Sequence, residues 1–70
     1  MSDLIKNLKW NKKIEVLRTI MNWSQREAAE KCNTGQKSYW AWESGERYPH
    51  KNNRIAIARA FGVSEGEIFN

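Results

Sequence analysis

A chain of 70 residues has room for one domain with a modest core, because a chain of this size buries only about 60% of the surface that its unfolded form exposes. One cysteine and one histidine exclude an intramolecular disulfide and offer no set of catalytic or metal-ligating groups, so we expect no enzyme, no cofactor, no metal and no small-molecule substrate. Twelve Lys and Arg against eight Asp and Glu give a formal net charge of +4, which favours a polyanionic partner.

Residues 1–10 are expected to form an N-terminal arm that is loose or only partly docked. Leu4, Ile5 and Leu8 have helical spacing, but no capping residue marks a helix start and chain ends fray. No apolar run in the chain approaches the roughly 20 residues that span a bilayer, and the start lacks the apolar core of a signal peptide. We therefore expect a cytoplasmic protein without a membrane partner, in which residues 11–70 form one domain.

The first predicted helix covers residues 11–21. Ile14, Leu17 and Met21 recur at helical spacing, with other apolar residues beside them, and form an apolar stripe along about three turns. This stripe is expected to face the core.

A capping box, SQRE at residues 24–27, predicts the start of a second helix, because the Ser24 hydroxyl and the Glu27 carboxylate can satisfy two free backbone amides. The helix should end near Asn33, a residue type that tolerates the left-handed conformation. The side chains expected to point inward are small, which allows another helix to approach closely: Ala28, Ala29 and Cys32.

A third helix is predicted at residues 36–44, directly after the short segment 33–35. Gly45 suits the left-handed position that follows a helix C-terminus. Two short helices joined by such a brief turn have the spacing of a helix-turn-helix unit.

The following loop and the fourth helix form a basic stretch. Pro49 places residues 47–50 in a loop, because a proline disfavours helical angles in the residue before it. The fourth helix is expected to open at Asn52 or Asn53 and to end at Gly62. Between residues 47 and 64 there is no acid, and we expect this stretch to meet DNA phosphate or, alternatively, to be a solvated face; its basic residues are Arg47, Lys51, Arg54 and Arg59, with His50 beside them.

A second capping box, SEGE at residues 64–67, predicts a short fifth helix. Ile68 and Phe69 at its end would fold back on the core. No alternation of apolar and polar residues favours a strand, so we predict an all-α, compact five-helix domain.

The third helix has two faces of different character. Tyr39 and Trp42 are expected in the core, because aromatic residues three apart on a helix usually pack inward. Gln36 and Lys37, in its first turn, have side chains that can pair with adenine and guanine if the helix enters a major groove by its N-terminal end. Alternatively, they are simply polar residues of an exposed turn.

Trp40 does not fit this division into two faces. It can contact thymine methyl groups or sugars, support a dimer contact, or belong to the core if the helix is rotated. Trp10 and Trp23 are expected to cover the core as staples or lids. Arg18 and Glu43 are candidate partners of an ion pair that would orient the third helix against the first.

Residues 14–69 together resemble the Cro and phage-repressor type of helix-turn-helix proteins, also called the Xre family. The matching features are SQREAAEKC, the short turn, the ESG that closes the third helix, the loop with Arg47 and Pro49, and IAIARAFGVSEGEIF. Each feature is common alone, whereas their order and spacing are specific. The resemblance implies a lambda-repressor-like fold that binds double-stranded DNA.

The resemblance also implies roles for single residues. The positions that would face bases are Gln36, Lys37, Trp40 and Ala41. The positions that would contact phosphates are Gln25, Ser38, Arg47, His50 and Lys51. Arg18 and Glu43 match a recurrent salt bridge of the family. The sequence departs from the family pattern at Trp40 and Ala41, which replace a polar pair, and at Lys51 and Arg54, which predict a basic, less buried start to the fourth helix.

We therefore expect a transcriptional regulator of phage or bacterial type, in particular a repressor, that binds a palindromic site as a homodimer. The residues suspected of serving the dimer contact are Trp40, Ile68 and Phe69. Because the sequence ends directly after the last predicted helix, no separate effector domain is expected. The alternative is a protein-interaction module, such as an adaptor or an antitoxin, that uses the same fold and its exposed aromatic residues.

Overall fold

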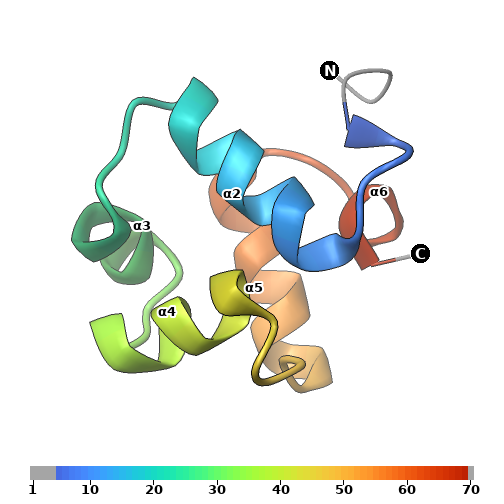
Figure 1. The fold of residues 1–70 in the computed structure, drawn as a ribbon. Helices are drawn as coiled ribbons and strands as arrows, with labels where there is room; N and C mark the ends of the chain where they lie inside the picture. Colours follow the sequence, from blue (N-terminus) through green and yellow to red (C-terminus); the bar gives the residue numbers. More distant parts are fainter. Residues whose placement is uncertain (1–4, 70) are drawn as a thin grey trace.

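The computed structural model describes residues 5–69, in which no strand occurs. The helices follow in the order α2 (Trp10–Ile20), α3 (Gln25–Lys31), α4 (Gln36–Ser44), α5 (Lys51–Phe61) and α6 (Glu65–Phe69). Figure 1 shows α2 along the top of the molecule, α3 at its side and α4 beneath, with α5 crossing behind them. These elements correspond to the five predicted helices, and the predicted all-α fold is confirmed. None of the helices in this range has the length and apolar character needed to cross a membrane.

The ends of α3 and α4 follow the local signals in the sequence. The Ser24 hydroxyl accepts a hydrogen bond from the Glu27 amide at 3.0 Å, and the Glu27 carboxylate accepts one from the Ser24 amide at 2.8 Å. Asn33 and Gly45 adopt left-handed conformations, with φ of 59° and 85°. The predicted capping box and both predicted helix ends are therefore confirmed.

The start of α5 differs in detail from the prediction. α5 begins at Lys51 rather than at Asn52 or Asn53, because His50 takes the extended N-cap conformation and its carbonyl already accepts from the Arg54 amide at 2.9 Å. At α6, the Glu67 carboxylate accepts a hydrogen bond from the Ser64 amide at 2.9 Å, as the predicted second capping box requires. The Ser64 hydroxyl also donates to this carboxylate at 3.1 Å, and the Glu67 amide donates to the Ser64 backbone carbonyl at 3.1 Å.

The core lies where α2, α3, α4 and α5 meet. Small residues on α3, Ala28 and Ala29, allow α4 to pack closely against it, as the sequence predicts. Tyr39 and Trp42 of α4 are both buried, with their ring centroids 6.1 Å apart, which confirms the predicted core face of this helix. The other buried apolar residues are Ile5, Ile14, Leu17, Cys32, Ile57, Ala58, Phe61 and Ile68.

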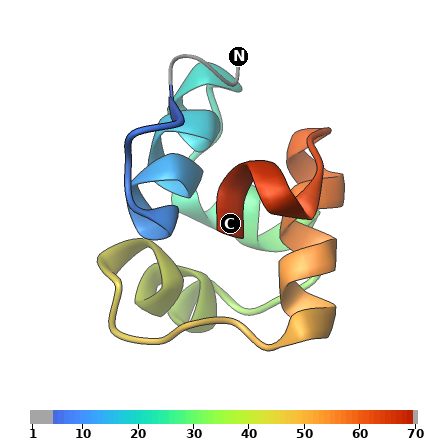
Figure 2. The same cartoon turned by 90° about the vertical axis from the view of Figure 1, so that its right-hand side faces the viewer.

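The segment before α2 packs against this core at one point. Ile5 is 1% exposed, whereas Leu8 is 38% exposed. Leu4, the other apolar residue of the expected arm, lies outside the described residues. Lys13 is buried and its Nζ donates to the Glu67 carbonyl at 3.0 Å, which ties α2 to α6. In Figure 2, α6 accordingly lies between α2 and α5.

Candidate nucleic-acid interface

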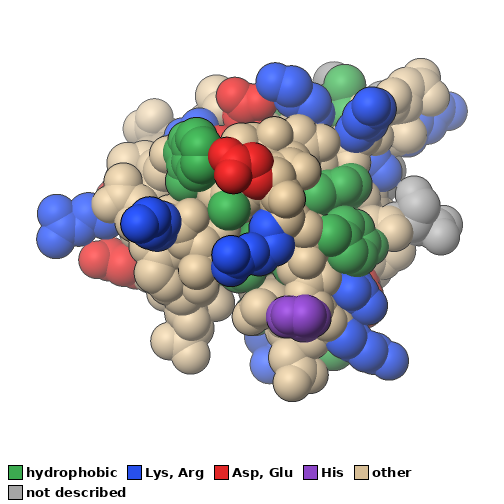
Figure 3. Space-filling model, turned by 60° about the horizontal axis from the view of Figure 1, so that its bottom comes forward, with side chains coloured by type: hydrophobic (Ala, Val, Ile, Leu, Met, Phe, Trp, Pro, Cys, Tyr) green, Lys and Arg blue, Asp and Glu red, His purple; other side chains and the backbone are tan. Residues whose placement is uncertain are grey.

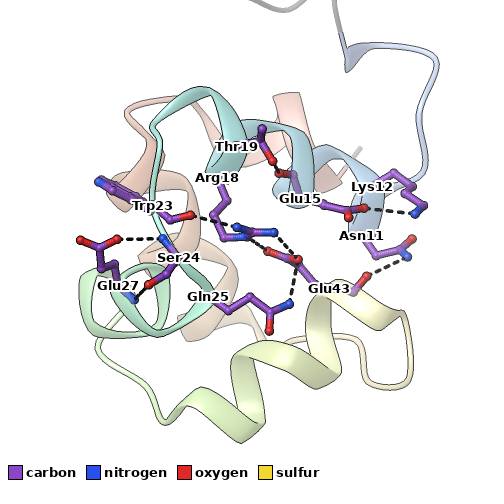
Figure 4. A network of polar contacts seen from close by, with 10 residues as sticks. All are labelled: Asn11, Lys12, Glu15, Arg18, Thr19, Trp23, Ser24, Gln25, Glu27 and Glu43. Carbon is purple, nitrogen blue, oxygen red and sulfur yellow. Dashed lines mark hydrogen bonds and ion pairs between the residues drawn. The ribbon is translucent and has the colours of Figure 1, made fainter.

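A network of polar side chains fixes α4 against α2 and α3 (Figure 4). Arg18 Nε donates to Glu43 Oε2 at 2.6 Å, and Gln25 Nε2 donates to Glu43 Oε1 at 3.1 Å. Arg18 Nη1 also donates to the Trp23 carbonyl at 2.9 Å. The Glu43 side chain is only 5% exposed and that of Arg18 18%. The pair predicted from the sequence thus lies at the junction of three helices, mostly shielded from water.

The charges in this network are compatible with burial. The hydrogen bond with Glu43 raises the pKa of Arg18, although desolvation works against it. Burial and, secondly, the Glu43 carboxylate raise the pKa of Tyr39. Arg18 is therefore charged and Tyr39 is a neutral phenol, so Glu43 has a cationic partner inside the protein.

The exposed face of α4 is opposite its core residues. Gln36, Lys37 and Trp40 are exposed and Ala41 is half-buried. Trp40 is 47% exposed, so the interpretation that places it in the core is wrong. The helix is rotated so that Tyr39 and Trp42 fill the core, which leaves Trp40 on the outer side.

Two hollows in the surface flank Trp40. The first is lined by Gln25, Gln36, Lys37 and Trp40. The second, towards the end of the helix, is lined by Lys37, Ser38, Trp40, Ala41, Glu46 and Arg47. The four positions expected to face bases therefore lie side by side on one surface. Gln25 adjoins them, although its amide nitrogen is engaged by Glu43.

A third hollow gathers side chains that can bind an oxyanion. Its lining comprises Thr34, Ser38, Trp42, Arg47, Pro49, His50 and Asn53. It adjoins the N-terminus of α5, whose first turn receives no side-chain cap from His50. The free amides and the positive end of the helix dipole attract anions there. The structure thus brings Ser38, Arg47 and His50 together, with Lys51 exposed in the first turn of α5 beside them.

Three residues of this surface were missed by sequence reasoning. Thr34 and Asn53 line the third hollow, and Glu46 lines the second. Asn53 was already expected at the start of the fourth helix, but its place beside Ser38 and Arg47 depends on the packing of α4 against α5, which the sequence does not show. Nothing in the sequence distinguished Glu46 from an ordinary solvated acid.

The basic residues of the stretch after α4 do not lie on one surface, because Arg54 and Arg59 lie apart from the hollow that Arg47 and His50 line. Arg54 Nε donates to Glu65 at 2.8 Å and its Nη1 to the Pro49 carbonyl at 3.0 Å. Its guanidinium also lies over the Tyr48 ring, 5.3 Å from the centroid. Arg54 therefore holds the loop against α5 and α6. Arg59 of α5 lines a separate hollow together with Lys31 of α3.

Figure 3 shows the side of the molecule that includes α4 and the start of α5. Lys and Arg side chains, the histidine, a few Asp or Glu side chains and small hydrophobic areas are interspersed on this face. A mixture of cations with isolated apolar groups suits a polyanion that also has apolar features.

An aromatic group lies next to the loop that contains Arg47. The Tyr48 ring is 5.1 Å from that of Trp10 and 5.8 Å from that of Phe69. Tyr48 is 49% exposed. The suspected dimer contact through Ile68 is wrong, because this residue is 1% exposed and belongs to the core of its own chain.

The other predicted lid also covers the core. Trp23 is half-buried and stacks on Phe61 with ring centroids 5.6 Å apart. Lys31 lies over the outer side of Trp23, 5.6 Å from its centroid. Neither Trp10 nor Trp23 therefore belongs to the face of α4 that contains Trp40.

α3 and α4, two short helices joined by a brief turn, form a helix-turn-helix unit. A helix-turn-helix family model matches residues 14–68, and the chain belongs to this family, of the Cro and phage-repressor type. The chain is similar to the HTH-type transcriptional activator BcrR of Enterococcus faecalis, with 30% identity over 63 residues. The match covers 90% of this chain and 31% of that relative. No solved structure matches the chain.

The matched residues include α3 and α4, the two helices of the motif, together with α5 and most of α6.

Proposed function

We propose that the protein regulates transcription by inserting the N-terminal end of α4 into the major groove of double-stranded DNA. The observation that supports this most directly is the two-sided character of α4, whose inner side is fixed by Tyr39, Trp42 and Glu43. Its outer side presents Gln36 and Lys37 to a partner. A Gln side chain can pair with adenine N6 and N7, and a Lys side chain with guanine O6 and N7.

Contacts to the DNA backbone would set the register of α4 in the groove. Arg47 and His50 line the hollow at the start of α5, with Ser38 on its α4 side, and Lys51 lies beside it. Gln25 begins α3 on the other side of the base-facing surface, where its backbone amide is one of the free donors of that helix N-terminus. Phosphate contacts on both sides of a groove position a protein without selecting a sequence.

We further propose that two chains bind one palindromic site as a homodimer, with half-sites about one helical turn apart. A single domain of this size offers limited contact with DNA, so a second copy adds affinity. Tyr48 is the exposed apolar residue closest in sequence to the phosphate candidates, and it packs on Phe69 and Trp10. We place the dimer contact at Tyr48 and Phe69.

The mode of regulation that we propose is repression of phage or bacterial type, in the cytoplasm, through occupancy of a promoter. Occupancy needs only the DNA-binding surface described above, whereas activation needs a further contact with the transcription machinery. The relative BcrR is an activator. A reporter gene downstream of a promoter that contains the bound site distinguishes these modes. Its expression should fall when the protein is produced, whereas it would rise if the protein were an activator.

The alternative function is a protein-interaction module. It is favoured by the exposure of two large aromatic side chains, Trp40 at 47% and Tyr48 at 49%. The salt dependence of binding to duplex DNA separates the two functions, because counterions are released only when phosphates are neutralised. With two phosphates neutralised, by Arg47 and Lys51, the affinity should fall about tenfold between about 50 and 200 mM salt. Binding that ignores both salt and sequence would favour the interaction module.

A matched pair of variants sharpens this measurement. Arg47→Ala should reduce the slope of log affinity against log salt by about one, because the variant neutralises one phosphate fewer. Lys12→Ala serves as the control, because Lys12 is exposed on α2 and bonds only to Glu15, away from the outer face of α4 (Figure 4). Equal slopes for both variants would contradict the proposed position of the DNA.

A further inference from the structure

Trp40 is a large apolar side chain in a polar setting. It is 47% exposed, and no aromatic contact involves it among residues 5–69. Apart from Trp40 itself, the two hollows beside it are lined by polar or charged side chains and by Ala41. A surface that docks another protein usually has a contiguous apolar patch, and here the apolar area is confined to one indole and one methyl group.

The surroundings of Trp40 indicate which feature of DNA it would meet. The major groove contains one apolar group, the C5 methyl of thymine, amid hydrogen-bond donors and acceptors. The hollow that Trp40 and Ala41 line also contains one acid, Glu46, and two cations, Lys37 and Arg47. Charged groups of both signs suit base edges, which carry hydrogen-bond donors and acceptors beside the methyl group.

We propose that Trp40 is a specificity-determining residue that packs its indole against the C5 methyl group of a pyrimidine, beside the bases contacted by Gln36 and Lys37. Ala41, one position further along the same face, leaves room for the methyl group in the hollow that both residues line. Thymine and 5-methylcytosine have the same methyl group at the same place in the groove. The inference rests on the proposed insertion of α4 into the major groove.

Removal of the methyl group alone gives a direct test. The best-bound duplex selected from a random pool is synthesised with each thymine replaced in turn by deoxyuridine, which keeps base pairing and the O4 acceptor. At one thymine in each half-site the replacement should lower the affinity of the wild-type protein about fourfold, the value expected for one buried methyl. If a cytosine occupies that position instead, its methylation should raise the affinity by a similar factor.

Variants at two positions identify the residue responsible. In Trp40→Ala the deoxyuridine effect should disappear at that position, because no indole remains to cover the methyl group. Gln36→Ala is the matched control on the same face, and it should bind more weakly while keeping the methyl effect. Circular dichroism checks that both variants fold, which their exposed positions favour.

Each outcome supports or refutes the inference. A methyl effect that is present in the wild type and absent only in Trp40→Ala supports it. A selected consensus with no methyl-dependent position, or with an effect that persists in Trp40→Ala, overturns it while leaving the proposed function intact. If no consensus is selected at all, the proposed function fails and the inference fails with it.

Discussion

Replacement of Glu43 by glutamine tests the role of the network that holds α4. The substitution keeps the size of the side chain and removes its charge, so Arg18 loses the carboxylate to which its Nε donates at 2.6 Å. Arg18 would keep its hydrogen bond to the Trp23 carbonyl, at 2.9 Å. Its charge would then be mostly buried without an ionic partner.

The expected cost follows from the burial of the pair. Loss of one partner of a fully buried ion pair costs about 3–5 kcal/mol. Because Arg18 retains 18% exposure and can still bond to the new amide oxygen, we expect about 2–3 kcal/mol for Glu43→Gln. A domain of 70 residues has a free energy of unfolding of roughly 3.5–10 kcal/mol, so Glu43→Gln should remove a large part of the stability of the domain.

Urea unfolding, followed by tryptophan fluorescence and circular dichroism, measures this loss. Glu30→Gln is the matched control, because Glu30 lies 3.9 Å from Arg26 with side chains that are 70% and 79% exposed. Such exposed pairs contribute less than about 1 kcal/mol. If Glu43→Gln lowers the free energy of unfolding no more than Glu30→Gln does, the structural importance of the network is refuted.

Three further predictions concern the core, a turn and the dimer. Burial raises the pKa of the Cys32 thiol to about 12. Above about pH 9 the thiol therefore loses its proton in the unfolded chain but keeps it in the folded chain, and the free energy of unfolding falls as the pH rises. Urea titrations between about pH 9 and 10 should show a free energy of unfolding that declines by up to about 1.4 kcal/mol per pH unit, and the decline should be clearly smaller in Cys32→Ala, where only Tyr39 still contributes. Equal declines in the two proteins would contradict this prediction. Gly45→Ala should cost about 1–2 kcal/mol in thermal unfolding, because φ is 85° and the new Cβ would lie 3.1 Å from Asn11 Nδ2. Gly66→Ala, with no atom within 4 Å of the new Cβ, should not destabilise, and equal losses for both glycines would refute the argument. Tyr48→Lys should weaken self-association on DNA at least about tenfold in sedimentation experiments. Because the Tyr48 ring also packs on Trp10 and Phe69, the unfolding midpoint should fall as well, and the experiment is run below it. Unchanged association would exclude Tyr48 from the dimer contact.

The helices of the motif could be predicted because their signals are local. Ser24 and Glu27 form a capping box within four residues, and Gly45 supplies the left-handed turn that ends α4. The three-residue spacing of Tyr39 and Trp42 predicts the inner face of α4, whereas the position of Trp40 stayed open until the structure placed it outside. The helix ends and the inner face depend on neighbours along the chain, so the sequence alone determines them.

The features that could not be predicted depend on contacts between distant residues. The start of α5 is set by a loop that Arg54 holds through Pro49 and Glu65, while capping preferences alone favour asparagine. Apolar spacing likewise could not decide whether Ile68 faces the core or a partner, because a short last helix has too few turns to show a stripe. The phosphate-contact candidates were found by resemblance, and their gathering in one hollow required the three-dimensional arrangement.

Selection of bound duplexes from a random pool, carried out in parallel with the wild-type protein and with Lys37→Ala, tests the central claim most directly. Lys37 is exposed in the first turn of α4 and lines both hollows beside Trp40. If α4 enters the major groove, the wild type should enrich one consensus and the variant should lose preference for guanine at one position of each half-site. Failure of the wild type to enrich any sequence, or an identical consensus for the variant, would contradict the account.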